Sequence, residues 1–298
     1  MSVSLGPDEV VQEAPPRVSE WRRFRRVFFS RSLVRFSLAI LVLLVFTACF
    51  APWLAPYDPY QPGVGRPLEP PSREHLLGTD TLGRDTLSRL IYGSRTALLV
   101  GFVSMAIASV VGIPLGLTAG YSGGLVQTVI MRLMDAGLSF PTLLLALVVA
   151  AVLGSGIHNV IIALSVAAVP MYARVACGVT LSLKENDYIL AQRIIGASHW
   201  RTLTKHILPN AFPPLLVLMT MQLGNLILAE ASLSFLGIGI KPPGAAWGAM
   251  VNDGYKYLLT NPVLSFAPGI AIMLVVFAFN LVGDGLRDAL DPRLRGLL

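Results

Sequence analysis

Charged residues and cysteines are scarce in this chain of 298 residues. Asp, Glu, Lys and Arg make up 13% of it, whereas 54% is hydrophobic, and the mean hydropathy is +0.66. This composition leaves too little polar surface to cover a soluble globule. The two cysteines, Cys49 and Cys177, lie in or beside apolar runs, so we expect neither a disulfide framework nor a metal site. The composition predicts an all-α, polytopic membrane protein with one transmembrane domain.

A nucleotide-binding P-loop is also missing. Its Gly-Lys-Ser/Thr motif needs a lysine that follows a glycine, and none of the four lysines does. The net charge of +6 would suit nucleic acid, but the basic residues flank apolar runs, where membrane topology places them, so we expect no nucleic-acid partner. The sequence therefore predicts a non-catalytic membrane subunit that does not hydrolyse ATP by that route.

Runs without charged residues predict six membrane-spanning helices, because a charge at the bilayer centre is expensive. There are five such runs, and the third holds two spans because residues 154–159 form a polar, glycine-rich break. We expect the second span to end at the glycines of 120–124, and Arg132 and Asp135 to mark the approach of the third. The expected spans are about 34–55, 95–119, 136–154, 158–177, 212–234 and 263–284.

Lysine and arginine predict the orientation, since they concentrate on the cytoplasmic side. With six spans, 16 of the 23 basic residues lie on the side that holds both termini. We therefore expect both termini in the cytoplasm, a cytoplasmic N-terminal segment at 1–32, and a transmembrane domain at 33–298.

The inner loop at 184–210 has a pattern of its own. Gly196 can end a short helix over 187–195, and Ser198 can cap a second helix over 199–206, which Pro209 would close. In the second helix Trp200, Leu203 and Ile207 would share one apolar face. That face suits an interfacial helix on lipid headgroups or an element that docks on a cytoplasmic partner, and the pattern leaves both open.

This loop resembles the cytoplasmic signature loop of permeases of binding-protein-dependent ABC importers, in the dipeptide, oligopeptide and nickel subgroup. The residues that carry the resemblance run from Ala191 to Ser198 and from His206 to Asn210. The family pattern begins Glu-Ala-Ala, whereas Leu190 and Gln192 stand here for the glutamate and the second alanine. The resemblance implies a coupling loop that contacts the ATPase through Asp187, Tyr188, Ala191, Gln192, Arg193, Gly196, Ala197, Ser198, Leu208 and Pro209.

Further stretches resemble the C-type permease of the same subgroup, so that the likeness covers most of 30–295. They include 78–85, Ser139-Phe140-Pro141, 230–237, 242–248 and 279–292. The resemblance implies the six-helix domain of a type I, MetI-like ABC importer in the bacterial cytoplasmic (inner) membrane.

The resemblance also implies partners. They are a homologous B-type permease, two cytoplasmic ABC ATPases that use ATP and Mg²⁺, and an extracytoplasmic solute-binding protein. Alternating access would carry dipeptides or oligopeptides, with nickel or another small solute as the alternative. A channel or a secondary carrier, from another class of transport protein, is a further alternative. A carrier usually has several ionisable groups at mid-membrane, but Glu230 is the one carboxylate embedded in an apolar stretch. A channel needs a selectivity filter, but no filter-like repeat occurs.

Four residues on the predicted outer side are candidates for the solute path or for contact with the binding protein. Asp80, Arg84 and Asp85 also suit a capped, charge-balanced turn. Glu230, about 27 Å of helix rise from the inner end of its span, also suits a structural role. We expect His75 and His158 to be solvated, and Gly112, Gly116 and Gly120, spaced by four, to let two helices approach closely.

Overall fold

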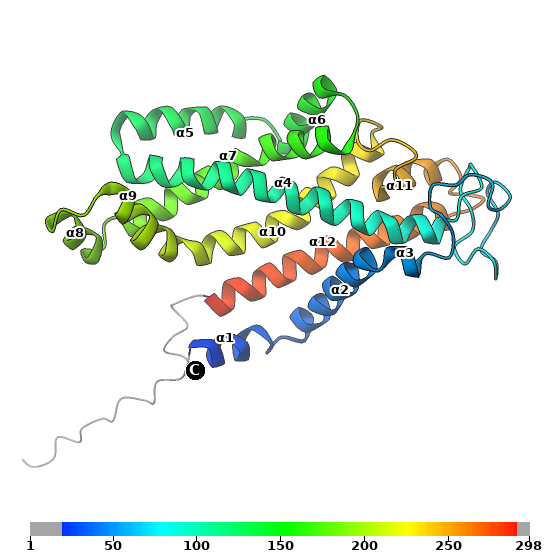
Figure 1. Cartoon of the computed structure of the whole chain (residues 1–298), viewed down its shortest axis with the longest axis horizontal. Coiled ribbons are helices and arrows are strands. Elements are labelled where there is room, and N and C mark those ends of the chain that lie inside the picture. Colours follow the sequence, from blue (N-terminus) through cyan, green and yellow to red (C-terminus); the bar gives the residue numbers. More distant parts are fainter. Residues whose placement is uncertain (1–19, 291–298) are drawn as a thin grey trace, which may run out of the picture.

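The computed structural model describes residues 20–290, which form a bundle of helices (Figure 1). Within these residues the β-structure is limited to one antiparallel bridge between Thr79 and Asp85. The helices are α1 Glu20–Phe28, α2 Ser32–Cys49, α3 Ala51–Leu54, α4 Thr86–Ser122, α5 Gly124–Leu138, α6 Thr142–Leu153, α7 Ile157–Leu183, α8 Asp187–Ile194, α9 His199–Thr202, the π-helical turn η1 Leu203–Ile207, α10 Leu208–Phe235, α11 Trp247–Tyr255 and α12 Val263–Leu290.

The chain passes back and forth along the bundle, through α2, α4, the bent pair α5 and α6, α7, α10 and α12 in turn (Figure 1). In the described part of the chain, α2, α4, α7, α10 and α12 are each long and apolar enough to cross a membrane. The bent pair α5 and α6 is long and apolar enough only when the two helices are counted as one span. Helices α8 and α9 lie at the same end of the bundle as α1 and the last turn of α12. We call this end of the bundle the knob end. The loop 55–85 and α11 lie at the opposite end, which we call the loop end.

The third passage differs from the expected straight span at 136–154. The stretch that holds Arg132 and Asp135 is already helical in α5, and the axes of α5 and α6 meet at 87°. Ser139-Phe140-Pro141 separates the two helices. Proline lacks the N–H that would continue the hydrogen-bond ladder, and it disfavours helical geometry in the residue before it, so the chain turns there.

Helices α4 and α7 form the centre of the bundle and pack along much of their length. A Cβ built on Gly116 would lie 2.2 Å from the carbonyl oxygen of Ala173, and one on Gly112 would lie 2.7 Å from that of Val169. Any larger residue would therefore push the helices apart. The predicted role of the glycine series in close helix packing is confirmed.

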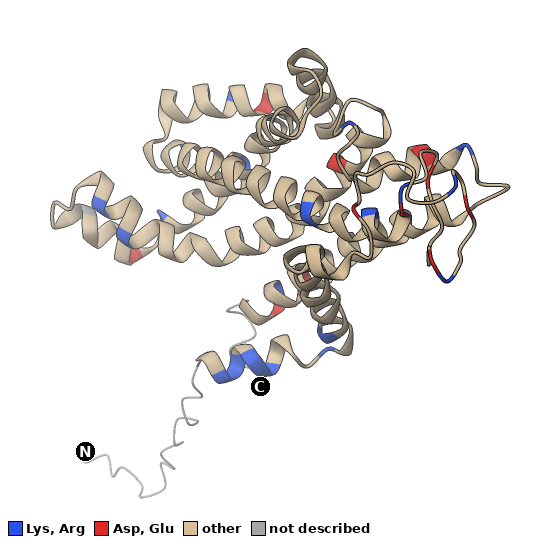
Figure 2. Ribbon diagram, turned by 45° about the vertical axis from the view of Figure 1, so that its right-hand side comes forward, with Lys and Arg blue, Asp and Glu red and all other residues tan. Residues whose placement is uncertain are grey.

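The N-terminal helix rests on the last passage. Phe28 and Val34 are buried against Val282 and Ala289 of α12, and Arg31 pairs with Asp288 at 2.8 Å. Helix α1 carries a cluster of arginines beside the bundle, whereas the middles of the long helices have few charged residues (Figure 2).

Candidate functional site

The knob, residues 187–207, is built from α8, a tight turn, α9 and η1. Gly196 has φ +75°, a left-handed conformation that glycine adopts without steric cost. The N–H of Ala197 donates to the carbonyl of Gln192 at 3.0 Å, as in a Schellman helix end. The Ser198 hydroxyl accepts from the N–H of Arg201 and caps α9. Gly196 and Ser198 thus end and begin the two helices at the positions that the sequence predicts.

Two details of the knob differ from the prediction. Pro209 does not close the unit, because η1 continues directly into α10 and Pro209 lies within this uninterrupted run of helix. The expected apolar face is also divided, since Ile207 is fully buried while Trp200 is 75% exposed. The π-helical turn η1 holds more residues per turn than an α-helix and so rotates Ile207 away from Trp200.

The knob is fixed to the bundle by buried contacts. Ile189 and Ile207 are fully buried in a cluster with residues of α4, α7 and α10. The Tyr121 hydroxyl lies 3.0 Å from Nδ1 of His199, and Nζ of Lys184 donates to the carbonyl of Gly120. These contacts connect the knob to α4, α7 and α10.

The exposed surface of the knob carries large apolar side chains among polar ones. Ile194, Ile195 and Trp200 are 85%, 73% and 75% exposed, and Ile195 and Gly196 line a hollow on this surface. Large exposed apolar side chains beside polar ones are typical of a surface that another protein covers. Of the predicted coupling residues, Asp187, Tyr188, Ala191, Gly196, Ser198 and Pro209 are exposed, while Gln192, Ala197 and Leu208 are half-buried.

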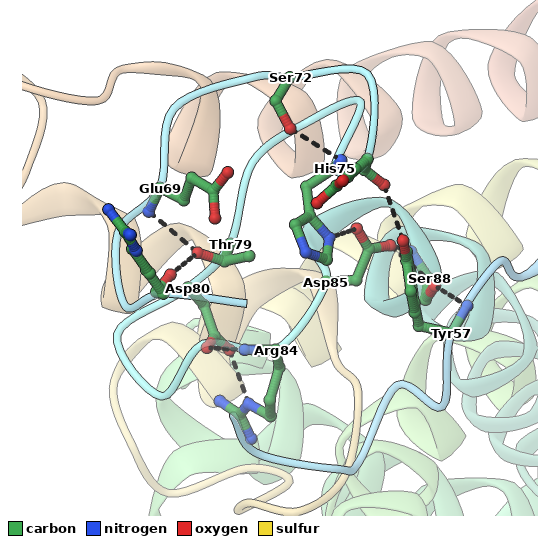
Figure 3. A network of polar contacts seen from close by, with 11 residues as sticks. Tyr57, Glu69, Ser72, His75, Thr79, Asp80, Arg84, Asp85 and Ser88 are labelled. Carbon is green, nitrogen blue, oxygen red and sulfur yellow. Dashed lines mark hydrogen bonds and ion pairs between the residues drawn. The ribbon is translucent and has the colours of Figure 1, made fainter. Parts of the chain in front are cut away.

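At the loop end, charged side chains are buried in a network (Figure 3). Nε of Arg84 lies 2.6 Å from Oδ2 of Asp80, and Oδ1 of Asp80 accepts from the N–H groups of Leu82 and Arg84. Asp80 is 8% exposed and Arg84 is 2% exposed. These bonds close the turn between 80 and 84 on itself.

Asp85 is the N-cap of α4 and the second centre of the network. Its Oδ2 accepts from the N–H and the hydroxyl of Ser88 at 2.7 and 2.8 Å, and its Oδ1 lies 3.0 Å from Nδ1 of His75. The expectation that His75 is solvated is wrong, since it is 3% exposed. The ring fits between Asp85 and Tyr57, whose ring centroid is 4.8 Å away. His158 is exposed, as predicted.

Arg89 belongs to the same network and was missed by the sequence analysis. Its Nη1 donates to the carbonyl of Pro59 at 3.1 Å and its Nη2 to that of Gly244 at 3.4 Å. Its Nε lies 3.5 Å from Asp80. One arginine in the first turn of α4 thus ties together the loop 55–85 and the segment before α11. Arg89 lies before the span expected at about 95–119, and its neighbours in the sequence do not indicate these contacts, because the partners come from distant segments.

Asp253 of α11 lines a small cavity together with Asp80 and Arg89. Burial raises the pKa of Asp253 above its ordinary value, and the attraction of Arg89 and Arg84 opposes part of that rise.

Glu230 lies near the loop end of α10 and is 1% exposed. The Ser234 hydroxyl donates to its Oε1 at 2.7 Å, and the same hydroxyl accepts from the N–H of Ile240. All four outer-side candidates are buried and hydrogen-bonded within the chain, so each has a structural role, and their part in the solute path or in contact with the binding protein stays a prediction. The structure brings Asp80, Arg84 and Asp85 together and places Glu230 apart from them, on α10.

Comparison with known proteins identifies the family. The model of the binding-protein-dependent transport system inner membrane component matches residues 112–296. The chain belongs to this family. A second model, the N-terminal transmembrane domain of oligopeptide transport permease C, matches residues 19–71.

Curated relatives resemble this family member over most of its length. The chain is 42% identical to a glutathione transport system permease protein of Pectobacterium atrosepticum, over 92% of each chain. It is 42% identical to a probable D,D-dipeptide transport system permease protein of Escherichia coli, over 87% of each. It is 44% identical to a di/tripeptide transport system permease protein of Pseudomonas aeruginosa, again over 87% of each.

Solved structures support the fold. An inward-facing form of the MetNI methionine ABC transporter has a chain that aligns with a TM-score of 0.57 at 21% identity, covering 69% of this chain and 98% of that one. The expected fold, the six-helix domain of a type I importer, is confirmed.

Proposed function

We propose that this chain is a permease subunit of an ABC importer for small peptides, and that the knob is the surface on which a cytoplasmic ATPase docks. The observation that carries the proposal is an apolar surface, exposed at Ile194, Ile195 and Trp200, that is anchored through Ile189 and Ile207 to the central helices. A surface of this kind both binds a partner and passes its movement to the bundle.

The orientation follows from charge. The arginines of α1 lie at the knob end, with the last turn of α12 (Figure 2). Since basic residues concentrate on the cytoplasmic side, the knob end and both termini are cytoplasmic, and the loop end faces outward.

The assembly has further partners. A homologous B-type permease completes the path, two ATPases supply ATP- and Mg²⁺-dependent movement, and a solute-binding protein delivers solute at the loop end. This chain itself binds no nucleotide. The names of the relatives favour peptides, because they are permeases for glutathione, D,D-dipeptides, and di- and tripeptides.

Substitution of Gly196 tests the docking surface. Valine at φ +75° costs about 1–2 kcal/mol in that conformation, so the turn is expected to rearrange and displace Ile195 from its position. In Gly196→Val we expect ATP-dependent peptide uptake and co-purification of the ATPase to be lost, while the amount of protein in the membrane stays within about twofold of the wild type.

Gly237→Val is the matched control. Gly237 has φ +78° and no neighbouring atom within 4 Å of a built Cβ. It follows α10 at the loop end, where the N–H of Ile238 donates to the carbonyl of Leu233 as in a Schellman helix end. The strain is therefore similar, but it falls outside the knob. Normal uptake in Gly196→Val, or equal loss of ATPase association in both variants, would contradict docking at the knob.

A further inference from the structure

Polar side chains form a stripe along the middle of α10. Gln222, Asn225 and Ser232 are spaced so that they lie on one face of the helix. Nδ2 of Asn225 donates to Oε1 of Gln222 at 2.8 Å, which joins the two amides into a pair. Asn225 is exposed, and Gln222 and Ser232 are half-buried.

This stripe is one wall of a groove. Leu164 and Ala168 of α7 line it, and Thr142 and Leu143 at the start of α6 line it on the other side. Helices α6 and α10 both pack on α7, which makes α7 the floor. The groove begins where the chain turns by 87° between α5 and α6, so that turn places Thr142 opposite the amide pair.

The depth of the pair excludes a lipid-facing role. Gln222 lies near the centre of α10, a helix about 42 Å long, and so near the middle of the bilayer. The bond between the two amides satisfies only one N–H of Asn225 and one lone pair of Gln222, and the remaining donors and acceptors would lack partners in hydrocarbon, which is unfavourable. Elsewhere the exposed mid-span positions carry apolar side chains, such as Val148 of α6 and Phe277 of α12. The groove is therefore expected to be filled by water or by a polar solute.

The chemistry of the lining indicates the kind of solute. The groove-lining residues are apolar or uncharged polar. An amide offers both a donor and an acceptor, which matches the peptide group and does not distinguish among side chains. The single bond between the two amides uses one N–H of Asn225 and one lone pair of Gln222, so further donor and acceptor capacity is available to a ligand.

We propose that the groove between α6, α7 and α10 is part of the solute path and that the Gln222–Asn225 pair binds the peptide groups of the passing solute. This inference rests on the proposed function, and it names the residues and the chemical group that they recognise.

Thiol labelling of the assembled transporter tests the path. In a Cys49→Ser background, Asn225→Cys is exposed to a charged, membrane-impermeant thiol reagent during ATP turnover, in vesicles of both orientations. The matched control is Phe277→Cys, which is also exposed and also lies at the middle of its helix. We expect cysteine at 225 to react at least about tenfold faster, because reagents of this kind react with thiolates in water. Dialanine and trialanine, supplied with the binding protein, should slow that reaction.

Uptake tests the amide pair. Asn225→Leu should lower uptake of the same peptides about tenfold, because a hydrogen bond to the passing solute is lost. Asn225→Gln keeps the amide and should recover most of the loss. A purely structural role would instead lower the amount of folded protein in the membrane and leave uptake per transporter unchanged in Asn225→Leu. Equal labelling at 225 and 277, no protection by peptide, or unchanged uptake in Asn225→Leu would each overturn the inference. If the wild-type transporter shows no ATP-dependent peptide uptake, the proposed function itself fails.

Discussion

The charged network at the loop end and the knob at the other end of the bundle are built in opposite ways. At the loop end, Asp80, Arg84, Asp85 and Arg89 are buried and bonded to one another or to the backbone. At the knob end, large apolar side chains are exposed on a short, well-anchored element. A buried network that satisfies its own charges is complete within one chain, whereas an exposed apolar surface needs a partner to cover it. Substitutions at the loop end should therefore affect folding, and substitutions at the knob should affect assembly.

Asp80→Ala is expected to have the largest effect. It removes the carboxylate that neutralises Arg84 and Arg89 and leaves two buried cations without that partner. Removal of one member of a buried ion pair typically costs about 3–5 kcal/mol. We expect a much lower thermal inactivation midpoint in detergent and little protein in the membrane.

Glu74→Ala is the control for this substitution, because Glu74 is an exposed acid in the same loop. Its effect on the midpoint should be small. If Asp80→Ala left stability unchanged but stopped transport, the network would be a working part of the solute path, and the contrast between the two ends would no longer hold.

The double substitution Ile194→Ser with Ile195→Ser tests the other half of the comparison. Both side chains are already exposed in the isolated chain, so the free energy of unfolding should change by no more than about 0.5 kcal/mol. Association with the ATPase should weaken by at least about tenfold, because two central apolar contacts are lost. Co-purification at several salt concentrations measures this association.

Leu259→Ser is its control, since Leu259 is a fully exposed apolar residue at the loop end. ATPase association should be normal in this variant. Loss of thermal stability in the knob variant would show that the knob supports the fold, as the network does.

The helices could be predicted because hydrophobic length and glycine spacing are local signals. Charge-free runs of about 20 residues predict spans, and glycines spaced by four predict close packing of α4 on α7. The turn of the knob was also predictable, since Gly196 and Ser198 act on their immediate neighbours.

Features that depend on distant partners could not be predicted in this way. His75 and Arg89 are beside polar loop residues in the sequence, which suggests solvent, but their partners come from segments brought together by the fold. The π-helical turn η1 turns Trp200 and Ile207 to different faces. It depends on tertiary packing, whereas the prediction from sequence assumed a regular α-helix. The amide residues Gln222 and Asn225 lie within a charge-free run of the sequence. Their position near the middle of the expected span was the signal that could have identified them.

Asp253→Asn should have the smallest effect and sharpens the comparison within the loop end. Asp253 is attracted by Arg89 and Arg84, but burial raises its pKa and so disfavours its charged form. Asp80 differs, because its carboxylate is directly paired with Arg84.

A raised pKa in the folded state means that the folded protein retains a proton that the unfolded chain has released. The contribution of Asp253 to stability is therefore full below the ordinary aspartate pKa of about 3.9 and declines as the pH rises through its folded-state pKa. Asparagine does not titrate, so the thermal midpoint of the variant should rise relative to the wild type as the pH increases from about 4 through the folded-state pKa of Asp253. A relative midpoint that fell over this range would show that attraction to the arginines outweighs burial at Asp253, and both aspartates would then hold the loop end together by charge.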